Sequence, residues 1–202
     1  MKCHGWRLGS CSVFLSFFLL LSACGRGQSG WQAFPVPVYV DVGLMSNPDD
    51  RADFEDGMRF WEEKAGKKLF DVQGEWTGGG LPYQGAAQNP DSIVENVVFV
   101  HYQWPFASGY VGMTVVKPFD SGQRALVMIN PNTNFCHGDC NYNFTETSMR
   151  KTFAHELGHF IGLQHSQSKG DIMYPTSLPG GSLNQLSFDE SALRTLTKSS
   201  EN

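Results

Sequence analysis

No cluster of basic residues occurs in the 202-residue chain, which has 15 lysines and arginines, 20 acidic residues and a formal charge of −5. Proteins whose main partner is nucleic acid present basic surfaces to the phosphates, so this absence argues against that class of function. Charged residues make up 17% of the chain and apolar residues 41%, which is typical of one globular domain with a sizeable core. We expect that domain to be a monomer.

The chain also lacks an apolar run long enough to cross a bilayer comfortably. Its longest such run, CSVFLSFFLLLSA from Cys11 to Ala23, has the length of a signal-peptide core and follows the basic residues Lys2 and Arg7. The run ends in LSAC at Cys24, which resembles the lipobox of bacterial lipoproteins, where the cysteine is lipidated and becomes the mature N-terminus. An ordinary secretory signal or an uncleaved anchor is the alternative.

This resemblance implies a signal peptide over residues 1–23, a lipidated tether over 24–34 and a folded domain over 35–202. Removing the signal peptide takes away two basic residues and no acidic residue, so the mature charge is −5 − 2 = −7. An acidic surface does not bind anionic lipid, so the lipid itself would hold the protein to a membrane. We therefore expect an exported cell-envelope lipoprotein, at the outer membrane or the cell surface.

Cysteine is scarce, and three of the five cysteines lie at or before the expected lipidation site. The remaining two, Cys136 and Cys140, occur in the segment CHGDC. An even pair in an exported domain predicts a disulfide that closes this small loop. The alternative is a metal site that draws on Cys136, His137, Asp139 or Cys140.

Strands and helices are mixed without regular alternation, which predicts an α+β fold with a sheet and helices on one side of it. Short apolar runs predict strands over residues 35–42, 68–76, 96–104, 109–118 and 124–130. Amphipathic patterns predict helices over residues 48–66, 143–163 and 187–198. The pairs Asn143 with Glu146 and Ser187 with Glu190 have the spacing of capping boxes for the last two helices.

Three of the six histidines fall within HELGHFIGLQH, residues 155–165. On a helix, His155 and His159 project from one face and can take two corners of a tetrahedral zinc site. Gly162 allows a sharp turn after the helix, so that His165 can return as a third ligand. Glu156 lies one residue round the helix, close enough to reach a metal-bound water as a general base. Three imidazoles without a metal would need three sets of hydrogen-bond partners, so we favour one bound zinc ion.

The full spacing His-Glu-x-x-His-x-x-Gly-x-x-His resembles the metzincin metallopeptidases and, within them, the matrixins, which are the matrix-metalloproteinase catalytic domains. Met173 in DIMYP stands where metzincins have their structural Met-turn, and LNQLSFDESALRTL is similar to the start of the matrixin C-terminal helix. The resemblance covers residues 35–198. It implies a twisted mixed sheet of about five strands, two long helices, an active-site cleft and a small C-terminal subdomain with the Met-turn and final helix.

The resemblance also implies a zinc-dependent endopeptidase, in which Glu156 activates a zinc-bound water to hydrolyse internal bonds of extended proteins or peptides. Residues that would contact the substrate lie on the edge strand and after the Met-turn: Gly112, Met113, Thr114, Tyr174 and Pro175. One alternative is a zinc-stabilised binding or structural lipoprotein without turnover. Glu156 disfavours it, because structural zinc needs no base and usually takes a fourth protein ligand. A metal-storage or metal-sensing lipoprotein is a further alternative.

Three departures from the matrixin pattern limit what the resemblance implies. The strands over 109–118 and 124–130 lack the histidines that hold a second, structural zinc in matrixins, so we expect a single zinc ion. We expect His101, on an earlier strand, to be a packed residue. The acidic stretch before the active-site helix is missing, which leaves calcium binding open. No cysteine-bearing propeptide precedes the domain, so we do not expect latency through a cysteine switch.

Overall fold

The computed structural model describes residues 30–78, 81–84, 92–119, 122–138, 140, 146–176 and 182–198. The expected signal peptide, the expected lipidation site Cys24 and most of the expected tether lie outside the described residues, as do Asp139 and Asn143. No helix in the described part of the chain has both the length and the apolarity needed to cross a membrane.

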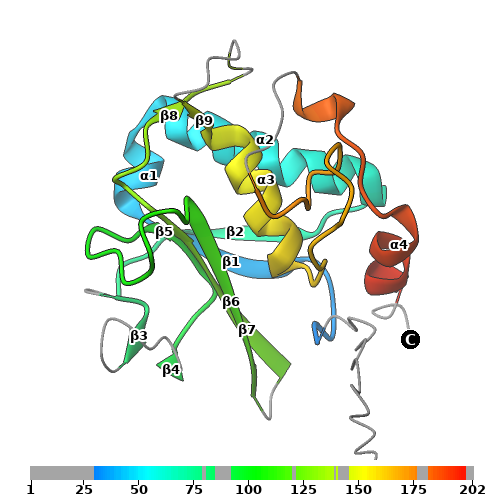
Figure 1. Cartoon of the computed structure of the whole chain (residues 1–202). Coiled ribbons are helices and arrows are strands. Elements are labelled where there is room, and N and C mark those ends of the chain that lie inside the picture. The colour runs from blue at the N-terminus through cyan, green and yellow to red at the C-terminus, as the bar shows by residue number, and fades with distance from the viewer. Residues whose placement is uncertain are drawn as a thin grey trace, which may run out of the picture.

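A five-stranded mixed sheet, ordered β2-β1-β5-β7-β6, organises the domain (Figure 1). Its strands are β1 (Val36–Val40), β2 (Phe70–Glu75), β5 (Val97–Val100), β6 (Gly112–Phe119) and β7 (Gly122–Ile129). All neighbouring pairs are parallel except β6 with β7, which are antiparallel and place β6 at the edge of the sheet. Two short pairs complete the strands: β3 (Tyr83–Gln84) with β4 (Ser92–Ile93), and β8 (Phe135–Cys136) with β9 (Thr147–Ser148).

Two long helices cover one face of this sheet, which confirms the predicted α+β fold (Figure 1). The helices are α1 (Val42–Ser46), α2 (Pro48–Ala65), α3 (Met149–Phe160) and α4 (Glu190–Lys198), with a 3-10 turn, η1, at Leu183–Gln185. Helix α2 begins where the Asn47 side chain accepts from two backbone N–H groups, and it ends before Gly66 in the left-handed conformation (φ 67°). Both ends therefore follow from local capping chemistry.

The predicted start of the active-site helix at residue 143 is wrong. Helix α3 begins at Met149, because Thr147 and Ser148 pair with β8 as strand β9 and are not available to a helix. The cap is Ser148, whose side chain accepts a hydrogen bond from the backbone N–H of Lys151 at 3.2 Å. The active-site helix is consequently shorter than its sequence pattern indicates.

The predicted cap of the last helix at Ser187 is also wrong. Asp189 takes that role, since its Oδ1 accepts from the backbone N–H of Ala192 at 2.9 Å. Ser187 instead uses its backbone, donating to Gly170 O at 3.0 Å and accepting from Ile172 N at 2.9 Å. The residue therefore ties the segment before α4 to the turn that follows the histidines.

Two apolar clusters lie on opposite faces of the sheet, as the alternation of side chains along a strand requires. On β7, Val127 and Ile129 join the larger cluster under the helices, whereas Leu126 and Met128 join the smaller, aromatic-rich one. On β6, the same alternation sends Val116 to the helix side and Met113 to the other side.

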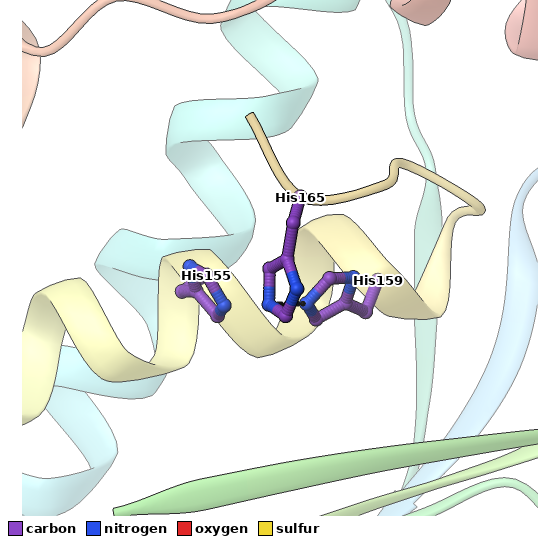
Figure 2. A group of neighbouring side chains, drawn as sticks. All are labelled: His155, His159 and His165. Atoms are coloured by element: carbon purple, nitrogen blue, oxygen red, sulfur yellow. Dashed lines mark hydrogen bonds between the residues drawn. The ribbon is translucent and has the colours of Figure 1, made fainter. Parts of the chain in front are cut away.

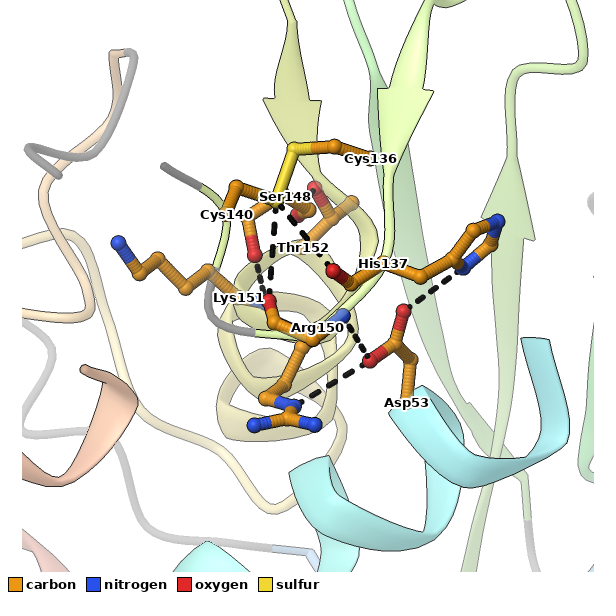
Figure 3. The surroundings of a disulfide bond; sticks show 9 residues. Asp53, Cys136, His137, Cys140, Ser148, Arg150, Lys151 and Thr152 are labelled. Atoms are coloured by element: carbon orange, nitrogen blue, oxygen red, sulfur yellow. Dashed lines mark hydrogen bonds and ion pairs between the residues drawn. A yellow bond between two sulfur atoms is a disulfide. The ribbon is translucent and has the colours of Figure 1, made fainter. Parts of the chain in front are cut away.

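The CHGDC loop is closed by a disulfide between Cys136 and Cys140, with their Cα atoms 6.0 Å apart (Figure 3). The pairing removes the sulfur ligands that the alternative metal site would need. Asp53 of α2, 1% exposed, accepts hydrogen bonds from Gly138 N at 3.0 Å and from the His137 ring at 2.9 Å. The loop is therefore fastened to α2.

The same carboxylate reaches the first turn of α3. Arg150 donates from Nε to Asp53 at 3.2 Å (Figure 3). Its Nη2 forms an ion pair with Asp56 at 2.8 Å. Two acidic residues one turn apart on α2 thus hold one arginine of α3, and with it the N-terminal end of the active-site helix.

Helices α2 and α3 cross at close range because position 57 has no side chain. A Cβ atom at Gly57 would lie 3.0 Å from Ala154 N and 3.1 Å from Phe153 Cβ. One turn further on, the fully buried Trp61 donates from its ring nitrogen to Ala154 O at 2.6 Å. These contacts hold α3 in place along its axis relative to α2, and they do so at Ala154, the residue directly before His155.

Replacing Gly57 by leucine should lower the free energy of unfolding by about 1–2 kcal/mol, because the side chain overpacks against the α3 backbone by more than leucine gains in helix propensity. Urea unfolding followed by circular dichroism measures the change. The matched control is Gly109→Leu, since a Cβ at position 109 has no neighbour within 4 Å. Equal stability of the Gly57 variant and the wild type would contradict the close crossing.

Candidate active site

Three imidazoles converge at the end of α3 and in the segment that follows it (Figure 2). One ligand nitrogen from each of His155, His159 and His165 lies within 4.8 Å of the others. The first two project from one face of α3, as their four-residue spacing requires. Gly162, with φ 108°, then reverses the chain and returns His165 to the same point.

Backbone carbonyls fix the orientation of two of these rings. His155 donates from Nδ1 to Ile172 O at 2.7 Å, and His159 donates from Nδ1 to Leu163 O at 2.8 Å. A carbonyl can only accept, so the proton is on Nδ1 and the lone pair of Nε2 is left for a metal. This arrangement of a ligand imidazole and a supporting acceptor is usual at metal sites.

The spacing of the nitrogens fits a zinc ion. Nε2 of His159 and Nε2 of His165 lie 3.1 Å apart, close to the roughly 3.3 Å edge of a tetrahedron with zinc–nitrogen bonds of about 2.0–2.1 Å. Within the described ranges, no fourth histidine, cysteine or carboxylate joins the group. Three nitrogen ligands with one open position are typical of catalytic zinc, whereas structural zinc usually has four protein ligands.

Burial keeps the three histidines in the form that binds a metal. It lowers the pKa of His159 to about 4, with a further lowering from the neighbouring His155. Burial also lowers the pKa of His155, against the opposing effect of its bond to Ile172 O, and it lowers the pKa of His165. All three imidazoles are therefore neutral near pH 7, with lone pairs available.

The Met-turn lies directly under the histidines. Asp171 accepts from Met173 N at 2.7 Å, and its backbone carbonyl accepts from Tyr174 N at 3.0 Å. Met173 is 2% exposed, and a Cβ at Gly158 would overlap its sulfur. Ser166 N donates to Met173 O at 2.9 Å, which ties the third histidine's segment to the turn.

Sequence reasoning did not single out Asp171 or Gly158. An aspartate whose side chain bonds the backbone two residues on is a known turn signal, so Asp171 had a local signature. Gly158 had none, because its need for a missing side chain arises only from the contact with Met173 and Trp61.

Glu156 faces the edge strand β6 and follows the first of the three histidines on α3. The side chain is 5% exposed, and its Oε2 accepts from the Thr114 hydroxyl at 2.6 Å. Burial raises the pKa of Glu156 to about 7, while the bond from Thr114 lowers it. A metal cation nearby would favour the ionised form. The carboxylate can therefore both accept and release a proton near neutral pH.

The residues expected to contact substrate are in two places. Gly112 and Thr114 lie on the helix side of β6, next to Glu156, whereas the Met113 side chain packs in the aromatic-rich cluster behind the sheet. Tyr174 is half-buried and Pro175 exposed, directly after the Met-turn. Residues 177–181, which follow shortly after, lie outside the described residues.

His101 occupies a different environment. It is fully buried after β5, and its Nε2 lies 2.7 Å from the Tyr83 hydroxyl. Its ring packs against Phe99 and Trp104, and burial lowers its pKa. These contacts fit the expected role of a packed residue.

The lowered histidine pKa values predict that zinc binding resists mild acid. Three histidines with the ordinary pKa of 6.5 would lose roughly fiftyfold in affinity between pH 7.5 and pH 6, because protons compete for each ring. Here the folded-state pKa values are lower, so binding should weaken less than about tenfold over this interval and fall only at more acidic pH. Competition with a chromophoric chelator measures it. A loss near fiftyfold would show that the rings titrate as exposed histidines do.

Comparison with known proteins assigns the family. A family model for the matrixins matches residues 51–193. Matrix metalloproteinase-26 of Homo sapiens is 35% identical over 75 residues, which cover 36% of this chain and 26% of that protein. Interstitial collagenases of Aquarana catesbeiana and Sus scrofa are 48% and 44% identical over 48 residues, 24% of this chain and 12% and 10% of their own lengths. The matches span only 10–26% of the length of these relatives. The family model, however, covers most of this chain, and the chain belongs to the matrixin family.

Proposed function

We propose that this protein is a zinc-dependent endopeptidase that cleaves internal bonds of extended proteins or peptides. The observation that carries the proposal is the three-imidazole site with one open position, next to the buried carboxylate of Glu156. Structural zinc has no use for such a base. Membership of the matrixin family supports the same reaction.

A zinc ion held by the three imidazoles would supply a Lewis acid that acidifies water and polarises a peptide carbonyl. The chain's own residues handle the protons and the geometry. Glu156 accepts a proton from water and later donates it to the leaving amine, a role suited to a pKa near neutrality. The carbonyls of Ile172 and Leu163 hold the His155 and His159 rings in their ligand orientation throughout.

The substrate would lie along β6. This strand is hydrogen-bonded to β7 on one side and forms the edge of the sheet on the other, so an extended peptide can add to it antiparallel. Such pairing uses the main chain of Gly112, Met113 and Thr114 and accepts an internal bond of many sequences. Tyr174 and Pro175 would border the pocket for the side chain that follows the cleaved bond.

We further propose that Cys24 carries a lipid and that the domain is exported. The LSAC segment supports the lipid, and the Cys136–Cys140 disulfide suits an oxidising compartment. Trp31, seven residues after Cys24, donates from its ring nitrogen to the backbone oxygen of Phe160 at 2.7 Å, and its ring stacks on the Phe160 ring. At most about 25 Å of extended chain would therefore separate the anchor from the folded domain. This tether favours substrates near the membrane.

Replacing Glu156 by glutamine should lower the cleavage rate roughly 10²–10⁴-fold, because a general base is lost, while zinc stays bound. His165→Ala should instead lose zinc and activity together. The measurement is cleavage of a peptide library, with the zinc content of each variant determined by elemental analysis.

Glu55→Gln is the matched control, since Glu55 is exposed on α2. A Glu156→Gln enzyme as fast as wild type would refute the assigned role of the base. Wild type that holds one zinc per chain and cleaves no peptide in the library would refute the endopeptidase proposal and favour a binding protein.

Replacing Cys24 by serine should release the protein from membranes into the soluble fraction, because the residue that carries the lipid is gone. Fractionation and mass spectrometry of the mature N-terminus measure the change, with Cys11→Ser as the control inside the expected signal peptide. An unmodified N-terminus at another residue in the wild type would exclude lipidation at Cys24.

A further inference from the structure

Two residues on the helix-facing side of strand β6, Thr114 and Gly112, lie beside the carboxylate of Glu156. The Thr114 hydroxyl lies 2.6 Å from Oε2 and 3.0 Å from the backbone oxygen of the same glutamate. Thr114 pairs with Val127 in the β6–β7 ladder, so its position is set by the sheet. A Cβ atom at Gly112 would lie 2.8 Å from Oε1. The edge strand thus bonds Oε2 through Thr114 and leaves space beside Oε1 at Gly112.

The two carboxylate oxygens have different partners. A threonine hydroxyl has one hydrogen to donate, and an ionised carboxylate is a stronger acceptor than a backbone carbonyl. The 2.6 Å separation is typical of a charge-assisted hydrogen bond, so the hydrogen lies toward Oε2. No hydrogen bond engages Oε1 in the part of the chain that the structure describes. Oε1 is therefore the oxygen left to exchange protons.

We propose that Thr114 is a positioning residue for the general base. Its hydroxyl holds Oε2, so that Oε1 alone meets the reacting water, and Gly112 leaves the space that Oε1 needs. The water O–H bond breaks as the Oε1–H bond forms, and the same proton later passes from Oε1 to the leaving amine. Oε2 keeps its hydrogen bond in both states, so the carboxyl group need not turn between the two transfers. This inference rests on the proposed endopeptidase function.

Valine and serine at position 114 separate the hydroxyl from the shape of the side chain. Thr114→Val should lower kcat roughly 10- to 100-fold, the usual effect of losing a hydrogen bond to a charged group. KM and zinc content should stay at the wild-type values, because neither the substrate-pairing backbone nor a ligand changes. Thr114→Ser retains the hydroxyl and should restore kcat to within about threefold of wild type.

Thr152→Val is the matched control. Thr152 is buried on the active-site helix, and its hydroxyl donates to Ser148 O at 2.9 Å and not to the Glu156 carboxylate. Loss of the Thr152 hydroxyl should leave kcat unchanged. If Thr152→Val reduces kcat as much as Thr114→Val, or if Thr114→Val turns over like wild type, the positioning role is wrong.

Crystal structures of the zinc-loaded wild type and Thr114→Val give a readout that does not depend on turnover. The wild type should keep Oε2 within hydrogen-bond distance of Thr114, and the valine variant should show the carboxylate displaced. A wild-type carboxylate turned away from Thr114 would overturn the inference. Absence of cleavage by the wild type would reject the proposed function, while these structures would still decide the position of Oε2.

Discussion

The site depends first on where helix α3 lies between α2 and the sheet. Trp61 bonds Ala154 O, and Gly57 lets the α3 backbone approach α2 to within contact distance. Arg150, bound to two acidic residues of α2, holds the other end of the helix. Because Glu156 and two of the three histidines belong to α3, a shift of this helix would move the metal ligands and the base together. It would also change the gap between the base and β6.

The metal ligands and the groups that support them all come from residues 155–174. The helix supplies two imidazoles, Gly162 reverses the chain, and the returning segment supplies both the third imidazole and the carbonyls that orient the first two. Asp171 then folds the turn that places Met173 under the site. Ligands and their supporting acceptors thus come from one continuous stretch. This is the physical reason why a sequence motif can specify a metal centre, since few long-range contacts are needed to assemble it.

Features that depend on neighbouring residues could be predicted from the sequence, whereas features that depend on long-range contacts could not. The strands of the sheet, helix α2 and the zinc site depend on periodicity, capping and spacing, which are local, and these predictions are confirmed. The start of α3 was predicted wrongly because Thr147 pairs with strand β8. The apolar periodicity of a helix carries no sign of such a long-range pairing. Thr114 was expected only to contact substrate. Its bond to Glu156 joins residues 42 positions apart and exists only once the sheet has set the position of β6.

Burial raises the pKa of the carboxyl group in this site and lowers the pKa of its imidazoles, and both shifts favour a bound metal. It raises the pKa of Glu156 to about 7, so the metal-free protein loses stability as pH rises from the unfolded value of 4.5 through 7. It lowers the pKa of His159 to about 4, so stability is also lost as pH falls from 6.5 toward 4. A divalent cation offsets both costs, because it binds neutral imidazoles and favours an ionised carboxylate. The Thr114 hydroxyl stabilises that same ionised form from the side of the sheet. The edge strand and a bound metal ion would therefore favour the same ionised form of the buried base.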